Sequence, residues 1–444
     1  GLVWRLAFPS MLAQFVSVLY SIVDRMYIGN ISEIGEAALA GVGVCGPIVT
    51  LVSSFAFLVG VGGAPLMSIR LGEKNERAAS QILANCFLML AVLSAVLTVA
   101  SLALRETLLW KFGAGEGTFG YAKEYITIYL MGTVFALMTT GMNQFIICQG
   151  FAKIGMKSVI LGAVTNIVLD PVFIFALDMG VKGAAIATVI SQVASCTYAL
   201  RFLFSDRIPI KITFRGYDWN VMKRVIQIGM TPFIIIAMDN VLIIALNTVI
   251  QRLGGPGQGD TLLTCTTIVQ SFMLVVTMPL GGITSGTQTI LGYNYGAKRP
   301  DRIWRAEKWI GGMALCFTTT MFLIAQLVPE IFVRLFTQNE EYIRLSVWAI
   351  RVYTLGVIPL AVQYTIVDGF TGMGISSVAM GLSMWRKTVF LAGVFLIPRF
   401  AGITNVFYTE PLSDFLGTVV SVLMFCLVFK RVVGNPHERK EAAA

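Results

Sequence analysis

The chain has 444 residues, of which 56% are hydrophobic and only 13% are charged, and its net charge is +9. Soluble domains are about 45–50% apolar and about 25% charged, so this composition excludes an ordinary soluble protein. The basic residues lie between apolar runs and form no stripe with interleaved aromatic residues, which argues against a nucleic-acid-binding protein.

Apolar runs of bilayer-crossing length follow one another along the whole chain, because about 20 apolar residues in a helix span the hydrocarbon layer. The first half predicts six transmembrane helices, near residues 4–29, 37–69, 78–104, 120–148, 154–177 and 182–204. After a polar stretch, the second half predicts six more, near residues 221–250, 261–292, 303–328, 341–368, 376–398 and 404–430.

The two halves are related by an internal repeat. Gln149-Gly150-Phe151, after the fourth helix of the first half, recurs as Asp368-Gly369-Phe370 after the fourth helix of the second. Because six helices per half is an even number, both halves insert with the same orientation, and a pseudo-twofold axis runs along the membrane normal. We therefore expect an all-α integral membrane protein of twelve transmembrane helices in two six-helix lobes. The expected parts are an N-lobe (1–204), a cytoplasmic linker (205–219), a C-lobe (220–434) and a cytoplasmic tail (435–444).

Lysine and arginine concentrate in alternate loops, as the positive-inside rule predicts for cytoplasmic loops. These loops follow the second, fourth, sixth and eighth helices, and the C-terminal segment is basic as well. We therefore expect both termini in the cytoplasm. Two lobes around a central cleft, rocking to open it to alternate sides, give the mechanism of a secondary transporter.

Ionisable residues inside apolar runs are the main functional signal, because each one costs about 2.5–3.5 kcal/mol at bilayer depth. Asp24 lies late in the first helix, and Asn166 and Asp170 lie four residues apart in the fifth, on one helix face. Such a pair of oxygen-bearing side chains is suited to a proton or a hard cation such as Na⁺, and the residues do not decide between them. The alternative is a helix-packing hydrogen bond with an interfacial carboxylate.

In the second half, Arg386 and Lys387 lie midway along the predicted eleventh helix and require acidic partners. Asp368 and Asp239 are the available acids, and a purely structural ion pair is an equally good interpretation. Pro9 removes a hydrogen bond in the helix that carries Asp24 and is a candidate hinge, although proline in transmembrane helices often has only a packing role.

Several segments together resemble the multidrug and toxic compound extrusion (MATE) family, and the resemblance runs over the whole chain. They are Pro9 to Gly29, Gln149 to Phe151, Asn166 to Pro171, Gly180 to Thr188, and Gly292 to Lys298, the last typical of bacterial members. The resemblance implies an antiporter of the bacterial inner membrane, driven by H⁺ or Na⁺, that exports amphipathic and often cationic drugs or metabolites. No cofactor besides the coupling ion is expected, and we expect the protein to act as a monomer among membrane lipids.

The resemblance also implies roles for individual residues. The ion-coupling network of the N-lobe matches Asp24, Asn166, Asp170 and Thr188 here, and the first-helix proline linked to bending matches Pro9. The C-lobe matches less closely, since some members use a seventh-helix Glu and a tenth-helix Asp. Candidate substrate-binding residues in that lobe are Asp239, Asn240, Gln270, Met273 and Asp368.

Four alternatives compete with a drug antiporter. A lipid-linked precursor flippase of the same superfamily usually has two more helices and a cationic cavity, and a dedicated natural-product exporter would have the same sequence features. A membrane enzyme would bring catalytic groups together at a membrane face, but the single histidine, His437, lies in the tail and no metal or nucleotide motif accompanies it. A channel would show a filter-like repeat, which the sequence lacks.

Overall fold

The computed structural model describes residues 1–112 and 114–433, and these residues form helices and connecting loops without a β-strand. Within them, eleven helices are long and apolar enough to cross a membrane, and one bent helix pair raises the number to twelve when it counts as a span. The expected all-helical membrane class is thereby confirmed. The predicted tail, 435–444, lies outside the described residues.

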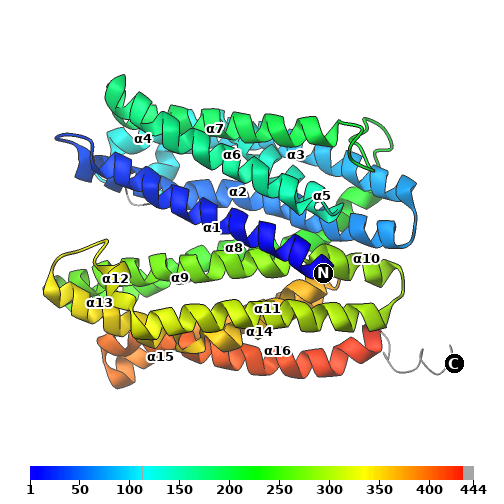
Figure 1. Ribbon diagram of the computed structural model, residues 1–444. Helices are drawn as coiled ribbons and strands as arrows, with labels where there is room; N and C mark the ends of the chain where they lie inside the picture. The colour runs from blue at the N-terminus through cyan, green and yellow to red at the C-terminus, as the bar shows by residue number, and fades with distance from the viewer. Residues whose placement is uncertain (113, 434–444) are drawn as a thin grey trace. The chain divides into compact units, whose positions relative to one another are not determined.

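The first of two compact units comprises Gly1–Ile236. Figure 1 labels its helices, and the last of them, α8, continues into the second unit. Their bounds are α1 (Leu2–Gly29), α2 (Gly35–Gly72), α3 (Glu76–Lys111), α4 (Phe119–Met131), α5 (Thr133–Cys148), α6 (Ala152–Pro171), α7 (Gly180–Leu203) and α8 (Trp219–Gly254). A π-helical turn, Val172–Ala176, extends α6.

The second unit comprises Ala237–Ala444. Its helices are α9 (Asp260–Gly286), α10 (Gln288–Gly296), α11 (Pro300–Leu327), α12 (Pro329–Val333), α13 (Glu340–Tyr353), α14 (Val357–Gly372), α15 (Ser376–Ala401) and α16 (Thr409–Val433). The boundary between the units falls within α8, and the predicted lobe limits 1–204, 205–219 and 220–434 stay a prediction.

Small polar side chains hold α6 and α7 close together. The Ser195 hydroxyl donates to the carbonyl oxygen of Ser158 at 2.7 Å, and the Ser158 hydroxyl donates to the carbonyl oxygen of Ser195 at 3.2 Å. Such hydrogen bonds and small residues let transmembrane helices approach closely. Since α6 also packs along α1 (Figure 1), the three helices bring their polar residues together.

Three predicted continuous helices are broken in the structure. The span predicted over 261–292 consists of α9 and α10, which are separated at Thr287. The span predicted over 120–148 consists of α4 and α5, which meet at Gly132 with a bend of 57°. A Cβ atom on Gly132 would lie 2.8 Å from Cγ2 of Val189 in α7, so glycine permits close packing at a point where it also weakens the helix. The span predicted over 341–368 likewise consists of α13 and α14, joined by a 3₁₀ turn at Thr354–Gly356.

Candidate functional site

Four predicted site residues meet inside the first unit, at the junction of α1, α6 and α7. Asp24 in α1 is 9% exposed, Asn166 and Asp170 in α6 are fully buried, and Thr188 in α7 is 6% exposed. A polar side chain removed from water needs hydrogen-bond partners or a bound ion. We refer to these four residues as the acidic cluster.

Helical spacing and one hydrogen bond build this arrangement. Asn166 and Asp170 are one turn apart, so both project from the same face of α6. The Asn166 amide nitrogen, Nδ2, donates to Oγ1 of Thr188 at 3.3 Å, and that hydroxyl donates to the carbonyl oxygen of Ala184 at 3.0 Å. The amide is therefore fixed with its nitrogen toward α7, which leaves its oxygen for the acidic side.

The carboxyl groups of Asp24 and Asp170 lie close enough to interact directly. Four buried oxygens of the cluster accept no hydrogen bond within the part of the chain that the structure describes: Oδ1 of Asp24, Oδ1 of Asn166, and both Oδ1 and Oδ2 of Asp170. Two adjacent ionised carboxylates repel each other strongly in a low-dielectric site. A shared proton or a hard cation would relieve that repulsion and satisfy the oxygens together.

Two tyrosines border the acidic cluster and a third packs against them, and sequence reasoning missed all three. Tyr20 of α1 interacts electrostatically with both acids, and Tyr125 of α4 interacts with Asp24. Tyr129 stacks on Tyr125 with ring centroids 6.1 Å apart. The spacing of Tyr20 and Asp24, one helical turn, was the only signal in the sequence, since α4 approaches the site through tertiary packing.

The candidate hinge, Pro9, lies buried in α1, which continues without interruption through it. Fifteen residues separate it from Asp24, which corresponds to about 22 Å along a helix axis. Pro9 is therefore outside the acidic cluster, on the helix that carries one of its acids.

In the second unit, Lys387 of α15 is buried and its ammonium group donates to Oδ1 of Asp239 in α8. A buried ammonium is stable only with such a partner. Of the two acids expected to pair with Arg386 and Lys387, Asp239 therefore pairs with Lys387.

Arg386 has partners that differ from those expected. Its guanidinium lies 2.9 Å from Oδ1 of Asp414 and 3.3 Å from Oε1 of Glu410, both on α16. The expectation that Asp368 would serve this basic pair is wrong. Glu410 and Asp414 were overlooked, although their spacing of four places both on one face of the last helix.

Asp368 of α14 is held instead by neutral donors. The hydroxyl of Thr284 donates to its Oδ2, and the Gln288 amide donates to its Oδ1 at 3.2 Å. Glu307 of α11 lies near Asp368, and its Oε1 accepts no hydrogen bond in the described chain. A Cβ atom on Gly369 would lie 2.0 Å from that oxygen, so the glycine leaves the space in which the carboxyl group packs against α14.

The remaining candidates for substrate binding, Asn240, Gln270 and Met273, lie in α8 and α9. Gln270 donates from Nε2 to the hydroxyl of Tyr353 at 3.3 Å. Met273 is 6% exposed in the apolar core, and Asn240 is partly buried beside Asp239 in α8. Among the described residues, no three or more His, Cys, Asp or Glu side chains are grouped as metal ligands.

Comparison with known proteins adds an independent line of evidence. The MatE family model matches residues 9–172 and 236–394. These segments contain Asp24, Asn166, Asp170, Asp239 and Asp368. The multidrug export protein MepA of Staphylococcus haemolyticus (strain JCSC1435) is 21% identical over 425 residues, covering 95% of this chain and 91% of the relative.

Solved structures share the fold over nearly the whole chain. An outward-facing multidrug resistance MATE family transporter of the MOP superfamily gives a TM-score of 0.91 at 21% identity, covering 98% of this chain and 96% of the other. A MATE structure in complex with MaD3S also gives 0.91 at 21% identity, covering 98% and 97%.

Proposed function

The chain belongs to the MatE family of membrane transporters, and from this premise we propose that it exports amphipathic, cationic drugs or metabolites in exchange for H⁺ or Na⁺. It is a transporter and not an enzyme. The observation that carries the proposal is the acidic cluster, in which buried oxygens of Asp24, Asp170 and Asn166 have no hydrogen-bond donor in the described chain. The staphylococcal relative is a multidrug export protein, which supports the substrate class.

The proposed coupling follows from the chemistry of the acidic cluster. When Asp24 and Asp170 are both ionised, their repulsion favours separation of α1 from α6. A proton between the carboxyl groups, or Na⁺ among the carboxylate and amide oxygens, removes that repulsion and favours their approach. The ion therefore binds the two arrangements with different affinities, which is the condition for driving a conformational change.

The proposed orientation places both termini in the cytoplasm of a bacterial cell, in the inner membrane. Its support is the set of connections after α2, α5, α7 and α10, which carry the basic residues and lie on one side when α4 and α5 count as one span. Drug uptake would then start from the basic side.

Ethidium efflux from proteoliposomes under imposed H⁺ or Na⁺ gradients tests the proposal. We expect Asp24→Asn and Asp170→Asn each to abolish gradient-driven efflux, because the amide neither takes up the proton nor neutralises Na⁺. Asp178→Asn is the matched control: Asp178 is exposed in the same unit, and its left-handed φ of 52° suits asparagine.

Three results distinguish the outcomes. If wild-type efflux depends on one gradient and both cluster variants lose it while Asp178→Asn stays active, the ion of that gradient is the coupling ion. Wild-type activity in both cluster variants refutes the coupling site. If the wild-type protein moves no ethidium under either gradient, the drug substrate class is wrong, and a dedicated metabolite or lipid-linked precursor becomes the substrate to test.

A further inference from the structure

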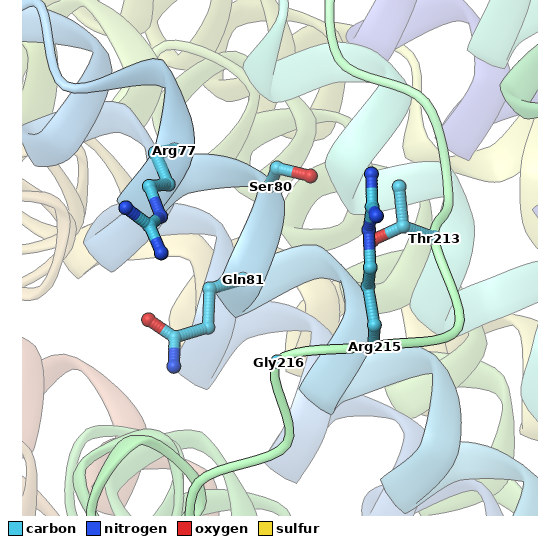
Figure 2. Close-up of a pocket in the computed structure, with 6 residues that line it drawn as sticks. All are labelled: Arg77, Ser80, Gln81, Thr213, Arg215 and Gly216. Carbon is cyan, nitrogen blue, oxygen red and sulfur yellow. The ribbon is translucent and has the colours of Figure 1, made fainter.

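A basic hollow of about 610 Å³ lies in the first unit, away from the acidic cluster. The start of α3 and the loop before α8 form it, and both adjoin connections on the basic side of the unit. Figure 2 shows the six residues that line it: Arg77, Ser80, Gln81, Thr213, Arg215 and Gly216. We refer to it as the α3–loop hollow.

The α3 side of the hollow is one helix face. Residues 77, 80 and 81 follow the i, i+3, i+4 spacing that places side chains over one another on a helix. In Figure 2 the Ser80 hydroxyl points toward Arg215 and Thr213, and Arg77 and Gln81 project on the opposite side of the view. The hollow is thus bordered by two guanidinium groups with hydroxyl and amide groups between them.

The loop side is built from hydrogen bonds. Buried Asn85 of α3 donates from Nδ2 to the carbonyl oxygen of Gly216 at 3.1 Å, and its Oδ1 accepts from the backbone nitrogen of Asp218 at 3.0 Å. Gln149 bonds to the backbone nitrogen of Ile210 at 2.8 Å and to its carbonyl oxygen at 3.1 Å. The backbone that carries Arg215 is therefore held in place by α3 and α5.

Alternating apolar residues anchor the same loop in the core. Ile208, Ile210 and Ile212 are buried. The ring of Phe214 contacts that of Phe87 at 5.9 Å between centroids. A cavity whose walls are fixed in this way binds a ligand without the cost of ordering a loop.

The charges in the hollow are not neutralised internally. Neither Arg77 nor Arg215 forms an ion pair with any residue in 1–112 or 114–433. Arginine side chains with adjacent hydroxyl donors are suited to phosphate oxygens, because a guanidinium group donates two parallel hydrogen bonds. The volume exceeds the need of a lone phosphate ion and falls in the range of sites for small organic molecules.

Exposed aromatic side chains beside the hollow place it at the level of lipid headgroups. Phe214, Tyr217 and Trp219 are 65%, 46% and 68% exposed. Tyrosine and tryptophan collect at the membrane interface, where their rings face the acyl boundary and their polar atoms face water. Basic groups at the cytoplasmic interface attract anionic lipids.

We infer that the α3–loop hollow binds a phosphate group, carried by the headgroup of an anionic phospholipid. Arg77 and Arg215 neutralise the phosphate, and Ser80, Gln81 and Thr213 bind headgroup hydroxyls. The inference does not depend on the transported substrate or on the coupling ion.

Native mass spectrometry of the purified full chain tests the inference, with phosphatidylglycerol and phosphatidylcholine titrated separately. We expect one molecule of phosphatidylglycerol to bind in preference to phosphatidylcholine. The loss of two charge-assisted contacts in Arg77→Gln/Arg215→Gln should raise its Kd about tenfold or more. The control variant is Arg207→Gln/Arg224→Gln, because both arginines are exposed in the same basic region. It removes the same charge and should change the Kd about twofold at most.

Soluble phosphate is distinguished by a competition arm with glycerol 3-phosphate and inorganic phosphate. Displacement of phosphatidylglycerol by either compound at equal concentration would support the phosphate site and assign it to a soluble ligand. Equal Kd values for the two double variants would overturn the inference, since binding would then follow net charge alone. Equal retention of phosphatidylcholine and phosphatidylglycerol would overturn it as well. If the arginine variant does not fold, Thr213→Val tests the hydroxyl contact in the same hollow, with a several-fold rise in the Kd for phosphatidylglycerol expected.

Discussion

Replacement of Arg386 by leucine tests the buried ion cluster of the second unit. Arg386 lies between Asp414, which is 0% exposed, and Glu410, which is 12% exposed. Removing one partner of a buried ion pair costs about 3–5 kcal/mol, because a charge is left without compensation. Since Arg386 serves two carboxylates, we expect Arg386→Leu to lower the free energy of unfolding by about 5 kcal/mol, at the upper end of that range.

A double-mutant cycle isolates the contact between Arg386 and Asp414. Asp414→Asn keeps an acceptor for the guanidinium and leaves Glu410 in place, so its cost should be about 1–3 kcal/mol. The double variant Arg386→Leu/Asp414→Asn has one fewer uncompensated carboxylate, and we expect it to be about 2 kcal/mol more stable than the sum of the single effects predicts.

Denaturant titration in detergent, followed by circular dichroism, measures these free energies. Arg344→Leu is the control, because Arg344 is exposed on α13 of the same unit and its replacement should cost about 0.5 kcal/mol or less. An Arg386→Leu effect within about 1 kcal/mol of this control would refute the structural role of the cluster. Strict additivity in the cycle would show that Arg386 and Asp414 do not interact.

Two further predictions concern the first unit. A Cβ atom on Gly229 would lie 1.8 Å from the carbonyl oxygen of Leu58, so Gly229→Ala should destabilise the protein by about 3 kcal/mol in the same titration. A Cβ atom on Gly43 meets no atom within 4 Å, so Gly43→Ala should not destabilise it. Equal effects of the two substitutions would contradict this reasoning. Thr188→Val removes the hydroxyl that accepts from the Asn166 amide, so it should lower the free energy of unfolding by about 1–3 kcal/mol and raise the coupling-ion concentration for half-maximal efflux. Thr197→Val, on the exposed face of α7, should have neither effect. An unchanged ion dependence in Thr188→Val would show that Thr188 does not belong to the ion site.

The acidic cluster was accessible from the sequence because its strongest signal is local. The spacing of Asn166 and Asp170 fixes them on one helix face whatever the rest of the fold does. Their contact with Asp24 and Thr188 depends on tertiary packing, and it was expected only from the family resemblance. The structure places all four together, whereas their role in ion coupling stays a prediction.

The ion cluster of the second unit was predicted less well because it depends on which helices become neighbours. Asp368 and Asp239 attracted attention as acids in apolar surroundings, whereas Glu410 and Asp414 lie near the start of the last helix, where acids are common. Glu307 lies among the basic residues near the start of α11, and helical phase alone buries it. A requirement for two acids near Arg386 was the only available signal.

The two units hold their buried acids in different ways, and this difference bears on which of them exchanges an ion. In the second unit, Glu410 and Asp414 share Arg386, and the exposed Asp239 pairs with Lys387, so three carboxylates face two fixed basic side chains of α15. Asp368 and Glu307 of the same unit have no basic partner among the described residues. Asp24 and Asp170 form no ion pair in the described chain, and in the proposed function their compensation comes from a mobile H⁺ or Na⁺. Only a mobile partner is able to enter from one side of the membrane and leave on the other. The internal repeat makes the halves equivalent in sequence pattern, but the fixed ion pairs of Arg386 and Lys387 have no counterpart in the acidic cluster. This difference supports the proposal that ion exchange occurs in the first unit.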